Sequence, residues 1–494
     1  MASLQQLHQL VHSLDKNEKR NLSLVIESIG GKARDRYMVS FRILNEQKEF
    51  DADKLKAKLS GHVKGMNLSE ANTNFYSFIC KTIGNYNIQA PGNVGLLKEL
   101  TLVETLISKG LYEHAEDLLQ PLLEKLNQGN SFGLLSRGQE LQSILSATID
   151  RLRLDFDKRL SFMDERIKTA ENHRQYLDVM RLNIRLTSTA QLIGDPRQES
   201  HKKLYEEMFN SPVFQLSISK VSHQVFIMYV PLRTDIIRLA EGNKAAIVEC
   251  LSALNEFKKR FNLRDHYTAA FYILDNLVSD YVREKDAEGI LQSLTELESL
   301  LPFARHKAVH QKIVAKIMFA ELAHSIIIKN YAGGVSHLDK WMAEDKQAQW
   351  NGAPLDYINY LLAARLHYLN NNPGKALDYL ILLQDKEKRM RASMQICYRF
   401  LFLLCHYKLR NFQFLEYATL SLQKNLSKLD KLYGPEKALL QFLKRCSDFD
   451  KVKNELQKLS VTFNQFEQDP YNKPFFEFGD YNEWLIMEME KKKV

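Results

Sequence analysis

Hydrophobic residues recur along this chain at the three- and four-residue spacing that places them on one face of an α-helix. At the N-terminus these positions are Leu4, Leu7, Leu10, Val11 and Leu14. Asp15 with Glu18 has the pattern of a capping box and predicts a second helix to about Ile29, which Gly30 and Gly31 end. Further helices are expected over residues 34–47, 52–59 and 68–86. Residues 1–90 are therefore predicted to be a short helical head or N-terminal cap.

A second pattern repeats through most of the remaining chain. A Gly, Asn or Asp turn is followed by a small or closely packing residue that opens an apolar helix, as in Lys109–Gln120 (KGLYEHAEDLLQ) and Asn371–Leu383 (NNPGKALDYLILL). The anchors Ala246, Gly289, Gly334, Ala376 and Leu415 are 43, 45, 42 and 39 residues apart. A period in the low forties, carried by paired helices, predicts an α-solenoid in which each repeat buries its apolar face against its neighbours.

Composition favours the same all-α fold and suggests its boundaries. Gly and Pro together make up 31 of 494 residues, and residues 122–195 and 232–301 contain no proline, which favours long helices. Asn87–Gly95 (NIQAPGNVG) is the predicted linker before a helical-repeat segment, residues 96–446, whose repeat boundaries between 134 and 220 stay open. The aromatic-rich residues 447–494 are expected to cap the last repeat. The alternative is a peptide-like segment that docks into the molecule's own groove or into a partner.

Charge and cysteine content point to a cytoplasmic binding protein without a nucleic-acid or membrane surface. The net charge is +8 over 494 residues with both signs interleaved, whereas nucleic-acid-binding proteins usually concentrate basic residues on one face. Five scattered cysteines without a CxxC pair indicate neither a disulfide framework nor a zinc knuckle. The first 20 residues lack the apolar core of a signal peptide, and no apolar run approaches the roughly 20 residues that span a bilayer.

One unit of the chain resembles the tetratricopeptide repeat. In Leu96–Leu126, Gly110 ends the first helix, Tyr112 follows two residues later, and Ala115 marks the close packing of the second helix. The resemblance implies a divergent, long-helix member of that superfamily, because the period is near 42 residues rather than 34 and the early Trp is missing. The layout of head and repeats is also similar to bacterial helical-repeat proteins of uncharacterised function. Neither likeness implies an activity.

No motif for catalysis, metal or cofactor binding stands out. His306 and His310 have the i, i+4 spacing of a two-His metal site, but no third ligand is nearby, so we expect a packing or solvated pair. Gly30-Gly31-Lys32 lacks the spacing of a phosphate loop and is interpreted as a helix stop. HExxH and GxGxxG motifs do not occur, and the GxSxG string Gly129–Gly133 (GNSFG) lies between predicted helices, without the preceding strand that a nucleophile elbow needs. We therefore expect a protein that is not an enzyme and needs no cofactor or metal.

The resemblance also implies where a partner would bind, because the first helix of each tetratricopeptide repeat lines the concave groove. Projection from the anchors places Arg365, Tyr368, Tyr407 and Lys408 on that side. Two cations and two phenols suit an acidic or carboxylate-ended peptide. The leading hypothesis is a non-enzymatic scaffold that binds a protein or peptide segment in its concave groove.

Two other functions stay open. The runner-up is a ligand- or peptide-sensing regulator whose head is a helix-turn-helix-like DNA-binding domain. The head carries 13 Lys and Arg against 9 Asp and Glu, a small excess for phosphate binding. A third possibility is an enzyme with its site between repeats. The identity of the partner and the oligomeric state do not follow from the sequence.

Overall fold

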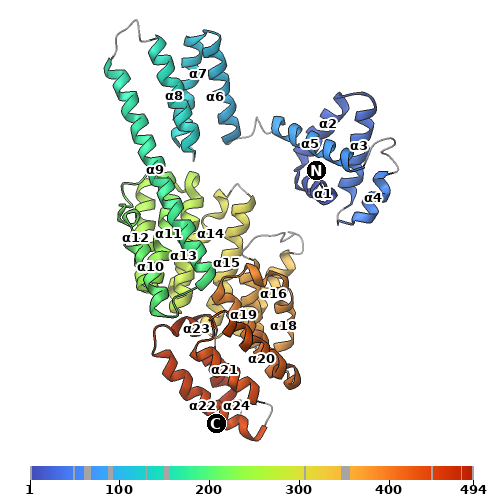
Figure 1. The fold of residues 1–494 in the computed structure, drawn as a ribbon, viewed down its shortest axis with the longest axis vertical. Helices are drawn as coiled ribbons and strands as arrows, with labels where there is room; N and C mark the ends of the chain where they lie inside the picture. Colours follow the sequence, from blue (N-terminus) through green and yellow to red (C-terminus); the bar gives the residue numbers. More distant parts are fainter. Residues whose placement is uncertain are drawn as a thin grey trace. The chain divides into compact units, whose positions relative to one another are not determined.

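The computed structural model describes residues 3–47, 50–60, 68–86, 93–128, 131–149, 156–304, 307–345, 356–446, 449–479 and 481–491. Over these residues the protein is all-α, as predicted: it has 24 α-helices, is 86% helical and contains no strand (Figure 1). Consecutive helices pack against each other. The chain divides into two compact units, Met1–Glu171 and Asn172–Val494, and each is described by itself.

The first unit begins with the five helices of the head. These are α1 (Leu4–Ser13), α2 (Lys16–Ser28), α3 (Gly31–Glu46), α4 (Ala52–Ser60) and α5 (Leu68–Tyr86). The predicted capping box is present, because the Asp15 carboxylate accepts the Glu18 backbone N–H at 2.8 Å and the Glu18 carboxylate accepts that of Asp15 at 2.9 Å. Leu7, Leu22 and Ile26 lie in a core closed to solvent. Residues 87–92 of the predicted linker lie outside the described residues.

Three further helices complete the first unit together with the start of α9. They are α6 (Asn93–Ser108), α7 (Tyr112–Gln128) and α8 (Phe132–Ile149). The turn between α6 and α7 contains Gly110 with a positive φ of 74°, and Ala115 is fully buried behind it. The residues that suggested the tetratricopeptide likeness therefore do form a helical pair with a tight turn. Helix α9 (Phe156–Ile193) continues into the second unit as one helix of 38 residues.

The second unit contains the end of α9 and fifteen further helices. These are α10 (Glu199–Phe209), α11 (His223–Glu241), α12 (Asn243–Arg260), α13 (Leu263–Glu284), α14 (Ala287–Glu298), α15 (Lys307–Ile327), α16 (Tyr331–Asp345), α17 (Asp356–Leu369), α18 (Pro373–Ile381), α19 (Ala392–Lys408), α20 (Phe412–Lys428), α21 (Gly434–Arg445), α22 (Phe449–Glu467), α23 (Lys473–Phe478) and α24 (Tyr481–Lys491). Short 3₁₀ helices occupy Pro212–Gln215, Leu301–Phe303 and Gln384–Arg389. Helices α11, α13, α15, α17 and α19 form a row in which each contacts the next but one in sequence.

The turns that join many of these helices repeat one hydrogen-bonding pattern. A residue with positive φ donates its N–H to the carbonyl three residues earlier, and the next N–H bonds to the carbonyl five residues before it. This is the Schellman motif, which satisfies carbonyls left open at a helix end. It occurs at Gly110, Lys285, Lys329, Asn371, Arg410 and Asp430.

The small anchor residues of the sequence repeat lie where two helices approach closely. Ala246 and Ala376 are fully buried, and Leu415 is 1% exposed. A Cβ added to Gly334 would lie 2.8 Å from the Ser325 Cβ and 2.9 Å from Leu366. Larger side chains would force the helices apart, which explains the recurrence of small residues.

The C-terminal aromatic segment packs onto the second unit. Helix α23 contacts α19 and α22, and α24 contacts α22. The Phe475 and Tyr481 rings stack with centroids 4.3 Å apart, and both rings are buried beside Phe400. Trp484 is 1% exposed. The segment covers apolar surface of α19 and α21, as a cap would.

Candidate functional site: a charged cavity in the second unit

A cavity of about 260 Å³ lies beside the row of helices α11, α13, α15, α17 and α19. The end of α9 and helix α23 complete its wall. Ten ionisable side chains line it, five basic and five acidic: Arg238, Arg283, Lys316, Arg365, Arg391, Asp195, Asp235, Asp275, Asp280 and Glu477. So many charges around a partly enclosed space distinguish this cavity from the apolar contacts elsewhere in the unit.

Arg238 of α11 is the centre of an ion-pair network on one wall. Its guanidinium lies 2.9 Å from Asp235, 3.1 Å from Asp195 and 3.6 Å from Asp280, although its side chain is only 7% exposed. Arg283 contacts the same Asp195 oxygen at 3.2 Å. Burying a guanidinium is costly unless it is paired and hydrogen-bonded, so the three carboxylates are what allow Arg238 to stay charged here.

The two most buried acids of this network respond to it in opposite directions. Burial disfavours the charge of Asp195, but Arg283, Arg238 and Arg391 together outweigh it and lower its pKa. Burial dominates at Asp280 and raises its pKa to about 7, with Arg238 and Arg283 compensating only in part. Burial likewise raises the pKa of Glu477. The cavity wall therefore holds one firmly ionised carboxylate and one that changes its charge near neutral pH.

Lys316 of α15 extends the polar lining toward the middle of the row. Its ammonium lies 2.7 Å from an Asp275 oxygen and donates to the Ser279 hydroxyl at 2.7 Å. The same ammonium lies 4.2 Å from the Phe319 ring centroid, a cation–π distance. Helices α13 and α15 are thus linked by charge at their inner faces.

Arg365 of α17 and Arg391, the residue before α19, add two guanidinium groups to the lining of the cavity. Ser393 and Cys397 of α19 lie beside them in the cavity lining. Arginine suits carboxylate recognition because its planar fork can donate two parallel hydrogen bonds. Arg365 and Arg391 therefore add positive charge to a cavity lining that also contains Asp195 and Asp280.

The loop after α9 also lines the cavity, through Gly194 and Asp195. Gly194 has a φ of 71°, and a Cβ added to it would lie 3.4 Å from the Ala392 Cβ. Gln191 Nε2 donates to the Met390 carbonyl at 3.4 Å. Residues near 192 and 392, about 200 positions apart, therefore meet at the mouth of the cavity.

The structure brings the four predicted groove residues together, with only Arg365 on the charged cavity. Arg365 and Tyr368 share a second, smaller cavity of about 20 Å³. The Lys408 ammonium lies 3.9 Å from the Tyr368 ring centroid and donates to the Tyr368 carbonyl at 2.9 Å. Burial lowers the pKa of Lys408 to about 8. The two phenols are in the interior: Tyr368 is 3% and Tyr407 is 6% exposed.

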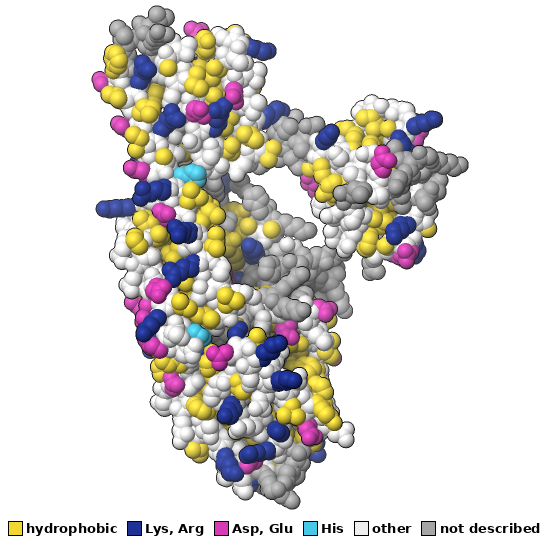
Figure 2. All heavy atoms as spheres, in the orientation of Figure 1, with side chains coloured by type: hydrophobic (Ala, Val, Ile, Leu, Met, Phe, Trp, Pro, Cys, Tyr) yellow, Lys and Arg dark blue, Asp and Glu magenta, His cyan; other side chains and the backbone are white. Residues whose placement is uncertain are grey.

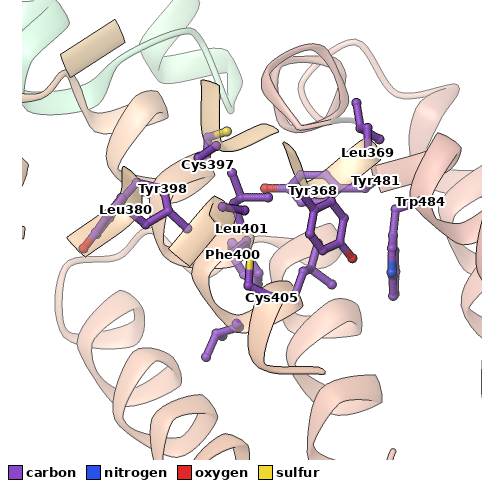
Figure 3. Close-up of a cluster of buried hydrophobic side chains, with 14 of the residues drawn as sticks. Tyr368, Leu369, Leu380, Cys397, Tyr398, Phe400, Leu401, Cys405, Tyr481 and Trp484 are labelled. Carbon is purple, nitrogen blue, oxygen red and sulfur yellow. The ribbon is translucent and has the colours of Figure 1, made fainter. Parts of the chain in front are cut away.

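The C-terminal helix α24 is what covers these phenols. The Trp484 and Tyr407 ring centroids are 6.0 Å apart, and Trp484 also contacts Phe442. Figure 3 shows Tyr368 among Leu401, Cys405, Tyr481 and Trp484. The expectation that Tyr368 and Tyr407 face an open groove is thus corrected: the chain's own tail fills the space beside them.

Sequence reasoning missed the residues that make the charged cavity. Asp235 with Arg238 and Asp280 with Arg283 have the i, i+3 spacing of surface ion pairs, which is the ordinary interpretation of such charges. Their distinguishing signal is that they stand within otherwise apolar helices, as in Tyr267–Val282. That pattern would have indicated buried charge on the inner row of helices.

Among the described residues no group of three or more His, Cys, Asp or Glu side chains could hold a metal ion. His306, one of the two histidines at metal-site spacing, lies outside those residues. No helix in the described part of the chain is long and apolar enough to cross a membrane.

The comparisons with known proteins add no family. No protein-family model matches the chain, and no curated protein matches its sequence. The likeness to the tetratricopeptide repeat therefore rests on the chain's own residues and turns.

Proposed function

We propose that this chain is a divergent tetratricopeptide-like α-solenoid that binds a segment of a protein partner and is not itself an enzyme. The Schellman turns at Lys285, Lys329, Asn371 and Arg410 support the repeat architecture, because they are 44, 42 and 39 residues apart, close to the period of the sequence pattern. The observation that carries the binding function is the charged cavity beside the inner row of helices.

The size and chemistry of the cavity favour side chains of a peptide segment as its occupant. Its 260 Å³ is just below the roughly 300–1,000 Å³ typical of small-molecule and cofactor sites. Arg365 and Arg391 would donate hydrogen bonds to a carboxylate of an acidic segment. The Asp235 side chain, which also lines the cavity, is 28% exposed and would accept a hydrogen bond from a donor of the same segment. The occupant we propose is therefore an acidic protein segment that contributes one or two side chains.

The test is affinity capture from the native lysate, followed by binding of a synthetic peptide from the captured protein. Arg391→Glu and Arg365→Glu each reverse one positive charge of the cavity lining and should each weaken peptide binding at least tenfold. Lys444→Glu makes the same charge change at an exposed position of α21 away from the cavity and should leave binding intact. Replacing the peptide's acidic residues by amides should reproduce the loss.

Equal binding by all three variants would refute the cavity as the site. Capture of nucleic acid in place of a protein would instead favour the regulator with a DNA-binding head.

A further inference from the structure

An open apolar groove lies between α18 and α20 of the second unit. Its volume is about 580 Å³, and α19 and the 3₁₀ helix Gln384–Arg389 complete its lining. The rings of Phe402, His406 and Phe414 lie together in it, with centroids 4.2 to 5.9 Å apart. Ile381 and Phe414, which both line the groove, are 58% and 43% exposed. Apolar side chains left in contact with water around a groove are typical of an interaction site.

Beside this groove, Tyr417 of α20 extends into solvent. It is 76% exposed, more than any other large hydrophobic residue in the described part of the chain. Phe414, Ala418, Ser421 and Asn425 of the same helix line the groove, and their spacing of i, i+4, i+7 and i+11 places them on one face. Tyr417 stands at the edge of that face, about 60° around the helix from Phe414. A groove with a protruding aromatic ring beside it can complement a second copy of itself, as a two-fold contact requires.

A row of three exposed residues on α20 identifies the partner as a second copy. Glu416, Leu420 and Lys424 follow each other at a spacing of four residues, so they lie along one side of the helix with the apolar residue in the middle. Neither charged side chain has an ion-pair partner among the described residues. Two copies that pack antiparallel with Leu420 at the centre bring Glu416 of each copy to Lys424 of the other. In a parallel pair, like charges would face each other.

The same antiparallel arrangement brings Tyr417 to the groove of the other copy. A two-fold axis that runs perpendicular to both helices, within the plane of their contact, keeps the groove side of one α20 next to the groove side of the other. Tyr417 precedes the central Leu420 by three residues, so it lies opposite the residues that follow Leu420 in the other copy. Two of those residues, Ser421 and Asn425, line the groove. The tyrosine ring would bury apolar surface there, and its hydroxyl would find a hydrogen-bonding partner in one of these two polar side chains.

We propose that the chain forms a homodimer through antiparallel packing of α20, with Tyr417 of each copy in the groove of the other. Figure 2 shows hydrophobic side chains together with both charge types over the region where Figure 1 places α18 and α20. None of the described residues that line the groove also lines the charged cavity, so the dimer leaves that cavity open. The proposal is therefore independent of the function proposed above.

Sedimentation equilibrium of the full chain tests this proposal. The wild type should give twice the 57.4 kDa of one chain at about 10–100 µM. Tyr417→Glu should give the mass of one chain, because it places a carboxylate in an apolar groove. Circular dichroism should show unchanged helical content in this variant, because Tyr417 is exposed within its own chain. Val248→Glu makes a similar change at a 68% exposed position of α12 and should leave the dimer intact.

Exchange of the two charges tests the antiparallel contact independently. Glu416→Lys alone sets two pairs of positive charges against each other, and Lys424→Glu alone sets two pairs of negative charges. Each should raise the dissociation constant of the dimer at least tenfold at low ionic strength, where screening is weak. The double variant Glu416→Lys with Lys424→Glu restores opposite charges across the contact, so it should dimerise as the wild type does.

Three results would overturn the proposal. The first is a single-chain mass for the wild type at every concentration. The second is a dimer whose dissociation constant is the same in Tyr417→Glu as in Val248→Glu, because the ring would then lie outside the contact. The third is a double charge variant that dimerises no better than the two single ones, because Glu416 and Lys424 would then not face each other.

Discussion

At the scale of single residues, the notable feature of this protein is charge placed where water cannot reach it. The side chains of Arg238 and Asp280 are 7% and 3% exposed, and Glu436 is fully buried. A buried ion pair is seldom more stable than an apolar pair of the same shape, so such groups are weak evidence for stability. Buried ion pairs are better evidence that the packing of the helices around them is fixed, because separating the two partners would leave a buried charge uncompensated.

Asp280 makes the stability of the folded protein depend on pH. Its pKa of about 7 in the folded protein exceeds the value of about 3.9 expected in the unfolded chain. The folded state therefore binds the proton more tightly, and stability from this group is lost as the pH rises from about 4 to 7. Asp280→Asn removes this titration. The unfolding free energy of the variant minus that of the wild type should therefore increase by about 2 kcal/mol between pH 5 and 7.

Urea denaturation of the two proteins across this pH range measures the difference. Asp378→Asn, at an exposed acid of α18, is the control and should follow the wild type. If the difference in unfolding free energy between Asp280→Asn and the wild type is the same at every pH, Asp280 does not titrate as its surroundings indicate.

At the scale of helices, the sequence predicts the helix ends and turns that are set by residues close together in the chain. The capping pair Asp15–Glu18 and the turn at Gly110 were identified from the residues, because each satisfies backbone groups within a few positions. The left-handed turns at Lys285, Lys329 and Arg410 carry no glycine and so give no compositional signal of positive φ. The sequence indicated these turns through the Asp or Asn beside each one and the small or closely packing residue that follows it.

Sequence patterns report local structure only, and this explains why Tyr368 and Tyr407 were wrongly expected to face an open groove. Their helix positions were predicted well enough to place both on the inner side of the unit. Their burial depends on Trp484 and Tyr481, which lie more than 70 positions away in the chain. Helical periodicity says which side a residue faces and cannot say which distant segment covers it.

Close packing at the anchors is testable with a single methyl group. Gly334→Ala would place a Cβ 2.8 Å from the Ser325 Cβ, an atom fixed to the backbone of α15. Overpacking of this kind costs about 1–3 kcal/mol, against a gain of about 1 kcal/mol in helix propensity. We expect a net loss of about 1 kcal/mol in unfolding free energy, seen as a lower denaturation midpoint.

Gly374→Ala is the matched control for that substitution. Gly374 also lies in a helix, α18, but a Cβ added there meets no atom within 4 Å. Its midpoint should stay the same or rise slightly. An equal rise in both variants would mean that α15 and α16 do not approach as closely as the anchor requires.

At the scale of the whole molecule, the second unit contains contacts between residues that are far apart in its sequence. Arg197, just before α10, donates to both Glu436 oxygens at 2.7 and 3.0 Å and to the Tyr471 carbonyl at 2.8 Å. Its guanidinium also lies 4.3 Å from the Tyr433 ring centroid. A helical row in which each helix touches only near neighbours would lack such contacts, so this pair makes the folding of distant repeats interdependent.

Breaking that pair should therefore affect the second unit as a whole. Glu436→Gln keeps the shape of the side chain but leaves Arg197 buried without a counter-charge, and Arg197→Leu does the converse. Each should lower the unfolding free energy by about 3–5 kcal/mol, the usual consequence of removing one member of a buried pair. The double variant Arg197→Leu with Glu436→Gln leaves no unpaired charge, so its loss should be clearly smaller than the sum of the two single losses. Hydrogen exchange should show faster opening in the single variants both near residues 199–209 and near 434–445, because the contact joins these two helices. Additive losses with exchange confined to one of the two helices would show that the pair does not join distant parts of the unit.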